Sequence, residues 1–156
     1  MSEQTADPGV RQPVQISPIG YVVTGYARPQ DAPAQATENY REPGRVVVHD
    51  EYADGLAGLE RWTHVWLLTW LHSQDDDEAG TLKCVPRGGA RGGTHRGVFS
   101  TRSPNRPSRL GMSLVRVLSV EGNVVHFNGV DLVDGTPVLD IKPWVRGTDT
   151  PPDLRA

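Results

Sequence analysis

Residues 112–130 read MSLVRVLSVEGNVVHFNGV, and this stretch decides the fold class. Its two halves, residues 112–120 and 123–130, are rich in valine and other residues that favour extended backbone. Between the halves stands Glu121-Gly122-Asn123, which is a strong signal for a tight connection between two strands. The stretch therefore predicts a β-hairpin, and with it antiparallel pairing.

Further strands are predicted on both sides of the hairpin. Short runs of β-branched, aromatic and aliphatic residues, bounded by Gly, Pro and Asp, occur at residues 14–23, 45–49, 62–71, 98–102 and 138–141. Residues 51–60 place Tyr52, Leu56 and Leu59 at helical intervals. Because strands greatly outnumber helices, we expect a mainly β protein: a single small antiparallel β-barrel with one short helix.

Three tryptophans fall four residues apart in the run 62–71. Trp62, Trp66 and Trp70 should share one face of a strand, because side chains alternate between the two faces. We interpret that face as core or as a subunit interface. The alternative is an aromatic cage that stacks on adenine or on a sulfonium cation.

The chain has 156 residues and reads as one globular domain. We expect a disordered leader over residues 1–13, the barrel over 14–147 and a loose tail over 148–156. The longest apolar run is too short to span a membrane as a helix, and the first residues lack an apolar signal core. A single cysteine, Cys84, excludes a disulfide within the chain. A cytoplasmic protein is the expectation.

Charge is distributed unevenly along the sequence. Residues 83–116 hold Lys83 and seven arginines but not one carboxylate, whereas residues 1–82 hold five basic and thirteen acidic residues. One interpretation is an anion-binding face, for nucleic acid in particular, because arginine suits phosphate and carboxylate. The other is a basic loop that pairs with the acidic half of this chain or of a second chain.

Several kinds of site are not predicted. The five histidines form no HxH or HxxxH pair, so we expect no metal. No GxSxG elbow occurs. The glycine-rich residues 88–93 match neither the phosphate-loop pattern nor the dinucleotide fingerprint, and we interpret them as a flexible loop.

Two segments carry more specific chemistry. Residues 97–117 read GVFSTRSPNRPSRLGMSLVRV and place Arg102, Arg106 and Arg109 on a proline-stiffened loop between two strands. Residues 129–144 read GVDLVDGTPVLDIKPW and cluster aspartates around an Asp-Gly turn next to Lys142. Such carboxylates can accept hydrogen bonds from a ligand, but a plain turn whose aspartates bond their own backbone gives the same pattern.

In this order, the two segments resemble the TrmO family, also called TsaA-like. The family patterns GVFATRSPxRPNPIGLSVVRL and DxxDGTPVxDIKPY match residues 97–117 and 131–144, and weaker matches extend the resemblance over residues 16–146. The resemblance implies a β-barrel methyltransferase outside the Rossmann class, with S-adenosylmethionine as cofactor near the interface of a homodimer. Family members include enzymes that methylate N6 of threonylcarbamoyl-adenosine at position 37 of tRNA.

The resemblance also implies site residues. The cofactor contacts carry over to Ala34, Gln35, His72, Ser73, Arg102, Met112, Asp131, Leu132, Gly135 and Thr136. Asp134 is the candidate catalytic residue, since a carboxylate that takes a proton would help a poorly nucleophilic amine. A purely structural role for Asp134 stays open. Arg106, Arg109 and Lys142 are the candidate substrate-binding residues.

The chain departs from the family pattern at three of these places. Ala34 stands where the pattern has arginine, Ser73 where it has glutamine, and Arg109 where it has proline. Three hypotheses therefore remain open: methylation of tRNA, methylation of a small metabolite or other nitrogen acceptor, and a non-catalytic module that binds cofactor or RNA.

Overall fold

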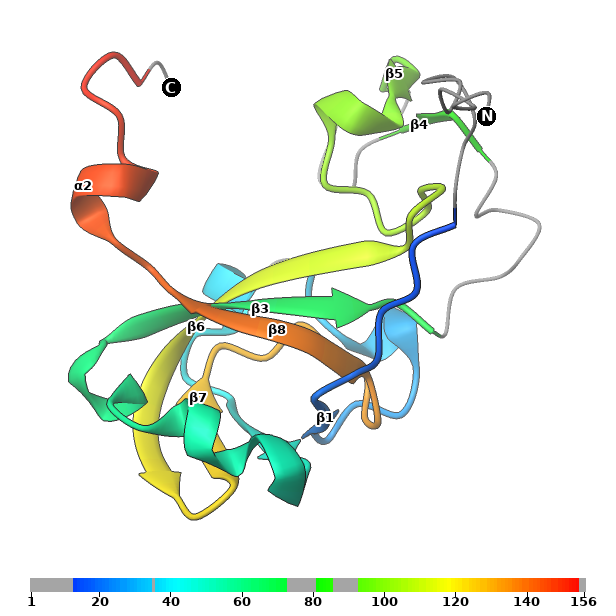
Figure 1. The fold of residues 1–156 in the computed structure, drawn as a ribbon. Coiled ribbons are helices and arrows are strands. Elements are labelled where there is room, and N and C mark those ends of the chain that lie inside the picture. The colour runs from blue at the N-terminus through cyan, green and yellow to red at the C-terminus, as the bar shows by residue number, and fades with distance from the viewer. Residues whose placement is uncertain (1–12, 35, 73–80, 86–92, 155–156) are drawn as a thin grey trace, which may run out of the picture.

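Six antiparallel strands close into a small barrel (Figure 1). The computed structural model describes residues 13–34, 36–72, 81–85 and 93–154. Around the barrel the strands follow the order β1 (Gly20–Val23), β2 (Pro43–Val48), β7 (Val124–Asn128), β6 (Leu110–Glu121), β3 (His64–Trp70) and β8 (Pro137–Pro143). The predicted hairpin is β6 and β7. The prediction of a mainly β fold built on an antiparallel barrel is confirmed.

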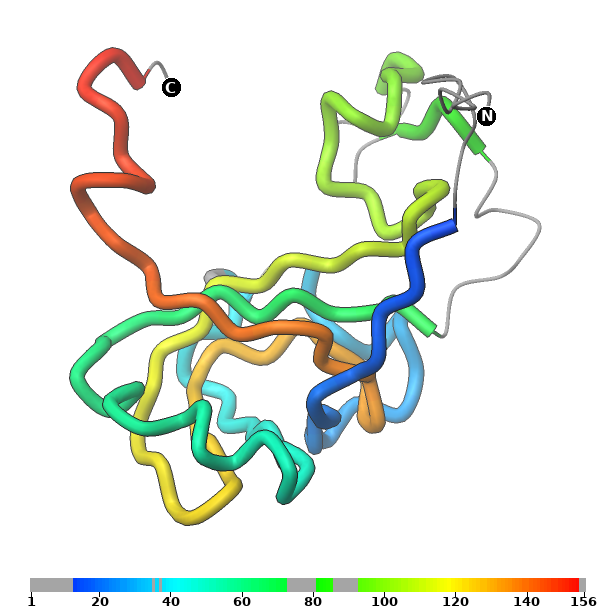
Figure 2. The backbone as a smooth tube through the Cα atoms, in the orientation of Figure 1, coloured from blue at the N-terminus to red at the C-terminus, as the bar shows by residue number. Residues whose placement is uncertain are grey.

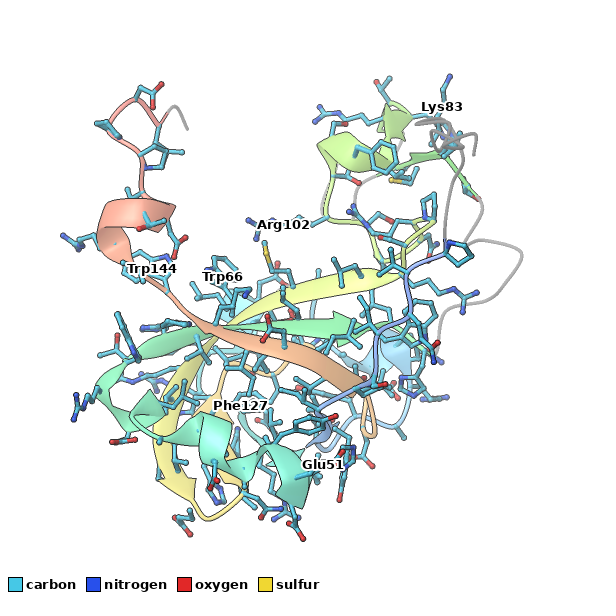
Figure 3. The ribbon with its side chains drawn as sticks, viewed as in Figure 1. Glu51, Trp66, Lys83, Arg102, Phe127 and Trp144 are labelled. Atoms are coloured by element: carbon cyan, nitrogen blue, oxygen red, sulfur yellow. The ribbon has the colours of Figure 1, made fainter. Side chains whose placement is uncertain are left out.

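Alternate residues of each strand fill the barrel. In β2 the inward side chains are Val46 and Val48, and in β3 they are Val65, Leu67 and Thr69. Phe127 of β7 is the largest fully buried side chain and lies within the barrel (Figure 3). Because β-branched residues pack well on a pleated surface, this valine-rich lining explains why these segments form strands.

Two predicted strands differ from the structure. Of residues 14–23, only Gly20–Val23 join the barrel, and Pro18 cannot donate a ladder hydrogen bond. The predicted strand 98–102 is wrong: Val98–Ser100 form the 3-10 helix η5. The hydroxyls of Ser100 and Thr101 donate to the carbonyls of Gly97 and Val98, and such local bonds compete with strand pairing.

The helices are short and mostly of the 3-10 type. The predicted helix over 51–60 is instead two turns, η3 (Asp50–Leu56) and η4 (Leu59–Arg61), separated at Gly58, where φ is +87°. The others are η1 (Pro29–Asp31), η2 (Ala36–Asn39) and α2 (Arg146–Asp149). No helix within the described ranges is long and apolar enough to cross a membrane.

The tryptophans do not lie in the core. Trp66 and Trp70 alternate with Val65, Leu67 and Thr69, and only the latter three point inward. Trp62 precedes β3 and is 40% exposed. The interpretation of these rings as core is therefore wrong, and they belong to the outer surface.

The first half of β6 is paired on one side only. β6 pairs with β3 along Leu110 to Arg116 but with β7 only from Arg116 onward. Its early residues thus leave an open edge, and η2 packs against β6. Outside the barrel, β4 (Lys83–Cys84) pairs with β5 (Arg96–Gly97). In the view of Figure 2, this pair and α2 rise on the same side of the barrel, at opposite ends.

Candidate functional site

A cavity of about 420 Å³ lies at the open edge of β6. Three segments wall it: residues 29–34 with Glu38, residues 101–113 and residues 131–136. Leu68 of β3 and Leu71 just beyond that strand complete the lining. This volume is within the range of sites for cofactors and other small molecules. The topology therefore brings the two sequence motifs together around one space.

A half-buried carboxylate, Asp131, forms one polar wall. Its Oδ1 accepts a hydrogen bond of 2.7 Å from the Ser113 hydroxyl, and the backbone N–H of Ala36 donates to the same carboxylate. Burial raises the pKa of Asp131 from 3.8 to about 6, with nearby Glu38 adding to the rise. The two hydrogen bonds act in the opposite direction, because they favour the ionised form. Asp131 can therefore present a negative charge to a cation at neutral pH.

Arginines form the other polar wall. Arg102 extends from its loop across the space above β6 (Figure 3) and lines the cavity. Arg106 also lines it, but its guanidinium donates to three backbone carbonyls: Ser103 at 2.8 Å, Val98 at 2.9 Å and Thr101 at 2.6 Å. Arg106 thus holds the loop in shape, while Arg102 supplies charge at the cavity.

Much of the remaining lining is apolar. Four leucines and a methionine contribute to it: Leu68, Leu71, Leu110, Met112 and Leu132. A cavity with a positive wall, a negative wall and an apolar floor suits a zwitterion that also carries a flat ring. S-adenosylmethionine has these parts: a carboxylate, an ammonium, a sulfonium and an adenine.

Seven of the residues predicted for the site line the cavity. They are Ala34, Arg102, Arg106, Met112, Asp131, Leu132 and Thr136. Among these, Thr136 is buried, and its hydroxyl donates to the carbonyl of Val133 at 2.6 Å. Gln35 and Ser73 lie outside the described residues.

Asp134 does not line the cavity. It is exposed in the turn before β8, and its Oδ1 accepts a hydrogen bond of 3.0 Å from the backbone N–H of Thr24. Gly135 follows with φ at +75°, which is the left-handed conformation that such a turn requires. The geometry matches a turn whose aspartate fastens the end of β1.

Gly135 does not line the cavity either, and three further predicted residues also lie away from it. His72 is exposed just past the end of β3. Lys142, on β8, pairs with Asp140 at 2.9 Å. Arg109 places its guanidinium over the ring of Trp70, 5.9 Å from the ring centroid.

Sequence reasoning missed five polar residues that line the cavity: Glu38, Thr101, Ser103, Ser108 and Ser113. The last four stand within the motif of residues 97–117, and that motif was the available signal for them. Glu38 carried none, since it stands in a long segment without periodicity. Within residues 13–34, 36–72, 81–85 and 93–154, no three His, Cys, Asp or Glu side chains are grouped so as to hold a metal ion.

Comparison with known proteins identifies relatives of this arrangement. Residues 21–150 match the family model described as the tRNA-methyltransferase O N-terminal domain. A probable S-adenosyl-L-methionine-binding protein of Methanothermobacter thermautotrophicus is 39% identical over 137 residues, which cover 88% of this chain and 94% of that protein. The human tRNA (adenine(37)-N6)-methyltransferase is 34% identical over 148 residues, covering 88% of this chain but 31% of that protein.

Solved structures agree with the sequence matches. The crystal structure of TrmO from Pseudomonas aeruginosa superposes with a TM-score of 0.73 at 32% identity, covering 92% of this chain and 62% of that one. This chain therefore spans nearly all of its archaeal relative, but under a third of the human enzyme and under two thirds of the bacterial one.

Proposed function

This chain belongs to the TrmO family of S-adenosylmethionine-dependent methyltransferases, and we propose that it methylates N6 of an adenosine in tRNA. The finer proposal is threonylcarbamoyl-adenosine at position 37 as the acceptor. The observation that carries the proposal is the cavity at the open edge of β6, where Asp131 and Arg102 offer opposite charges beside an apolar floor.

The cavity residues fit the cofactor's chemistry. Arg102 would hold the carboxylate of S-adenosylmethionine, because a guanidinium matches a carboxylate in charge and shape. Asp131 would accept hydrogen bonds from the ammonium or the ribose. Backbone groups around Met112 and Leu132 would bind the adenine edge. When bound, S-adenosylmethionine supplies a methyl group on a cationic sulfur that leaves as a neutral thioether.

The chain's part in the reaction is chiefly alignment. Holding the acceptor nitrogen in line with the methyl carbon can supply on the order of 7–11 kcal/mol of the barrier. The nitrogen must also lose a proton, and a carboxylate within reach would accept it. Asp131 and Glu38 are carboxylates on the cavity, whereas Asp134 is bonded to Thr24.

Support for tRNA as acceptor comes from two directions. Several relatives are named tRNA (adenine(37)-N6)-methyltransferases, and the acid-free residues 83–116 place Arg102 at the cavity. Binding of tRNA depends largely on neutralised phosphates. Against this, Ala34 lines the cavity where the family pattern has arginine. That loss favours the second candidate, a small nitrogen acceptor methylated by the same barrel.

Transfer of labelled methyl groups tests the proposal. Purified protein would be incubated with methyl-labelled S-adenosylmethionine and two pools: tRNA from a strain that lacks this gene, and a small-molecule extract of the same cells. Label at N6 of the modified adenosine at position 37 supports the proposal in full. Label only in the extract overturns the tRNA assignment. Cofactor binding without label in either pool would favour a non-catalytic module.

Two expectations from the family resemblance stay predictions. One is a homodimer, which light scattering on the purified chain tests directly. The other is a cytoplasmic location, which fractionation of cells tests.

A further inference from the structure

An aromatic ring and a cation lie together beside the cavity. Trp70, the last residue of β3, is 40% exposed on the outer face of the barrel. The Arg109 guanidinium lies over this ring, 5.9 Å from its centroid. Neither residue lines the cavity, so the pair is not explained by the cofactor site.

The pair adjoins the cavity through the backbone. Trp70 stands opposite Leu110 in the β3–β6 ladder, and the N–H of Leu71 donates to the carbonyl of Arg109 at 2.9 Å. Leu71 and Leu110 both line the cavity, and Leu110 is 44% exposed. A ligand that protrudes from the cavity past Leu110 would therefore reach the Trp70 ring.

The backbone at Arg109 has an unusual conformation. Arg109 has φ at +49°, the only positive φ among the described residues other than glycine. Its N–H donates to the carbonyl of Arg106 at 3.1 Å, which helps to hold the strained turn. Proline, which the family pattern has here, cannot adopt a positive φ. Strain of this kind persists where surrounding structure enforces it, and it is commonest at functional sites.

An aromatic ring with an arginine suits a nucleobase. Every base has a flat face that stacks on tryptophan, and a guanidinium adds favourable contact with both bases and phosphates. Arg102 lines the same cavity as Leu110, so a second cation is available to an anionic ligand that passes Leu110. A second copy of the chain, docked about a two-fold axis at Trp70, would instead bring two Arg109 side chains together.

We propose that Trp70 and Arg109 form a stacking platform for a nucleobase of single-stranded RNA next to the nucleotide whose base enters the cavity. The inference rests on the proposed function, because it assigns the platform to the same tRNA acceptor. It makes Trp70 a residue that recognises the acceptor strand, without a role in the transfer itself.

Trp62 provides a matched control. It is also 40% exposed, but it lies before β3 and does not touch the cavity or the Arg109 cation in any described contact. Trp70→Ala and Trp62→Ala thus remove equally exposed rings. Trp70→Phe keeps a stacking face, Trp70→Leu keeps only apolar area, and Arg109→Gly removes the cation where the backbone favours glycine.

The experiment measures methyl transfer at saturating S-adenosylmethionine against the concentration of unfractionated tRNA from a strain lacking the gene. We expect Trp70→Ala to raise KM for tRNA about tenfold, from the usual strength of base stacking, with the Kd of S-adenosylmethionine unchanged. Trp62→Ala should match wild type. Trp70→Phe should restore most of the affinity, whereas Trp70→Leu and Arg109→Gly should not.

Other outcomes overturn the inference. A KM of Trp70→Ala for tRNA within twofold of that of Trp62→Ala would show that Trp70 is not a stacking platform, without contradicting tRNA methylation. Loss of a dimer in Trp70→Ala alone, seen by light scattering, would show that a second copy covers the ring. If wild type transfers no methyl group to tRNA, the proposed acceptor itself is wrong, and that result is distinguishable from the other two.

Discussion

The hydroxyl of Ser113 donates a 2.7 Å hydrogen bond to the carboxylate of Asp131, and both residues line the cavity. Burial holds the pKa of Asp131 at about 6, and the ionised form is the one that attracts a cation. We therefore predict that S-adenosylmethionine binds more weakly below pH 6, by up to about tenfold per pH unit. Calorimetric titrations between pH 5 and pH 8 measure this dependence.

Two variants control the pH dependence. Asp131→Asn removes the titrating group, so its affinity should be weak and nearly flat across the range. Ser113→Ala removes a bond that favours the ionised carboxylate, so the midpoint should move to higher pH. An unchanged midpoint in Ser113→Ala would contradict the assignment of the titration to Asp131.

The same group should affect stability in the absence of cofactor. Asp131 has a higher pKa when folded, about 6, than its ordinary value of 3.8, so the folded state binds more protons between these values. Its contribution to the free energy of unfolding therefore falls as pH rises from about 4 to 6. Urea unfolding of wild type and Asp131→Asn over this range should show that the wild type loses stability relative to the variant as pH rises. A constant difference would contradict the raised pKa.

The sequence predicted the pairing of strands better than the faces of the strands. Residues 112–120 and 123–130 favour extended backbone and flank Glu121-Gly122-Asn123, which was enough to predict the hairpin. In residues 62–71 both alternate sets are apolar, because Trp66 and Trp70 interleave with Val65 and Leu67. A period of two then marks a strand without telling which side faces inward, and only closure of the barrel decides it.

The two turn aspartates show a second limit. Asp131 and Asp134 stand three residues apart in one motif, and local sequence treats them alike. Their difference comes from distant partners: Ser113 is 18 residues away from Asp131, whereas Thr24 is 110 residues away from Asp134. Such partners follow from the topology, so sequence alone could not separate the two carboxylates.

Arg106 should matter for the shape of the cavity more than for substrate contact. Its guanidinium bonds the carbonyls of Val98, Thr101 and Ser103, and a lysine cannot reach all three. Arg106→Ala leaves these partly buried carbonyls unpaired, so we expect a loss of roughly 1–3 kcal/mol in the free energy of unfolding. Urea titration measures it. Full stability in Arg106→Lys would contradict a structural role for the three hydrogen bonds of the guanidinium.

Substitutions of Asp134 test whether its role is structural or catalytic. Its Oδ1 accepts from the backbone N–H of Thr24, a contact that an asparagine side chain can reproduce through its amide oxygen. We predict that Asp134→Asn keeps both stability and methyl transfer, while Asp134→Ala loses about 1 kcal/mol of stability. Turnover rates and urea unfolding of the two variants test this. A large drop in kcat for Asp134→Asn, with normal stability, would restore Asp134 as the proton acceptor.

The strained turn at Arg109 predicts that Arg109→Gly is more stable than Arg109→Ala, which is the reverse of the order expected in a strand. Both Arg109→Gly and Arg109→Ala lose the guanidinium over Trp70, so they differ only in how each residue tolerates φ at +49°. Since a Cβ in the left-handed region costs roughly 1–2 kcal/mol, the glycine variant should be the more stable by about 1 kcal/mol. Arg116, in the middle of β6, is the control: there glycine weakens the strand, and alanine should be the more stable. Thermal and urea unfolding of the four variants measure both differences, and the same order at both positions would mean that the backbone at Arg109 is not strained in solution.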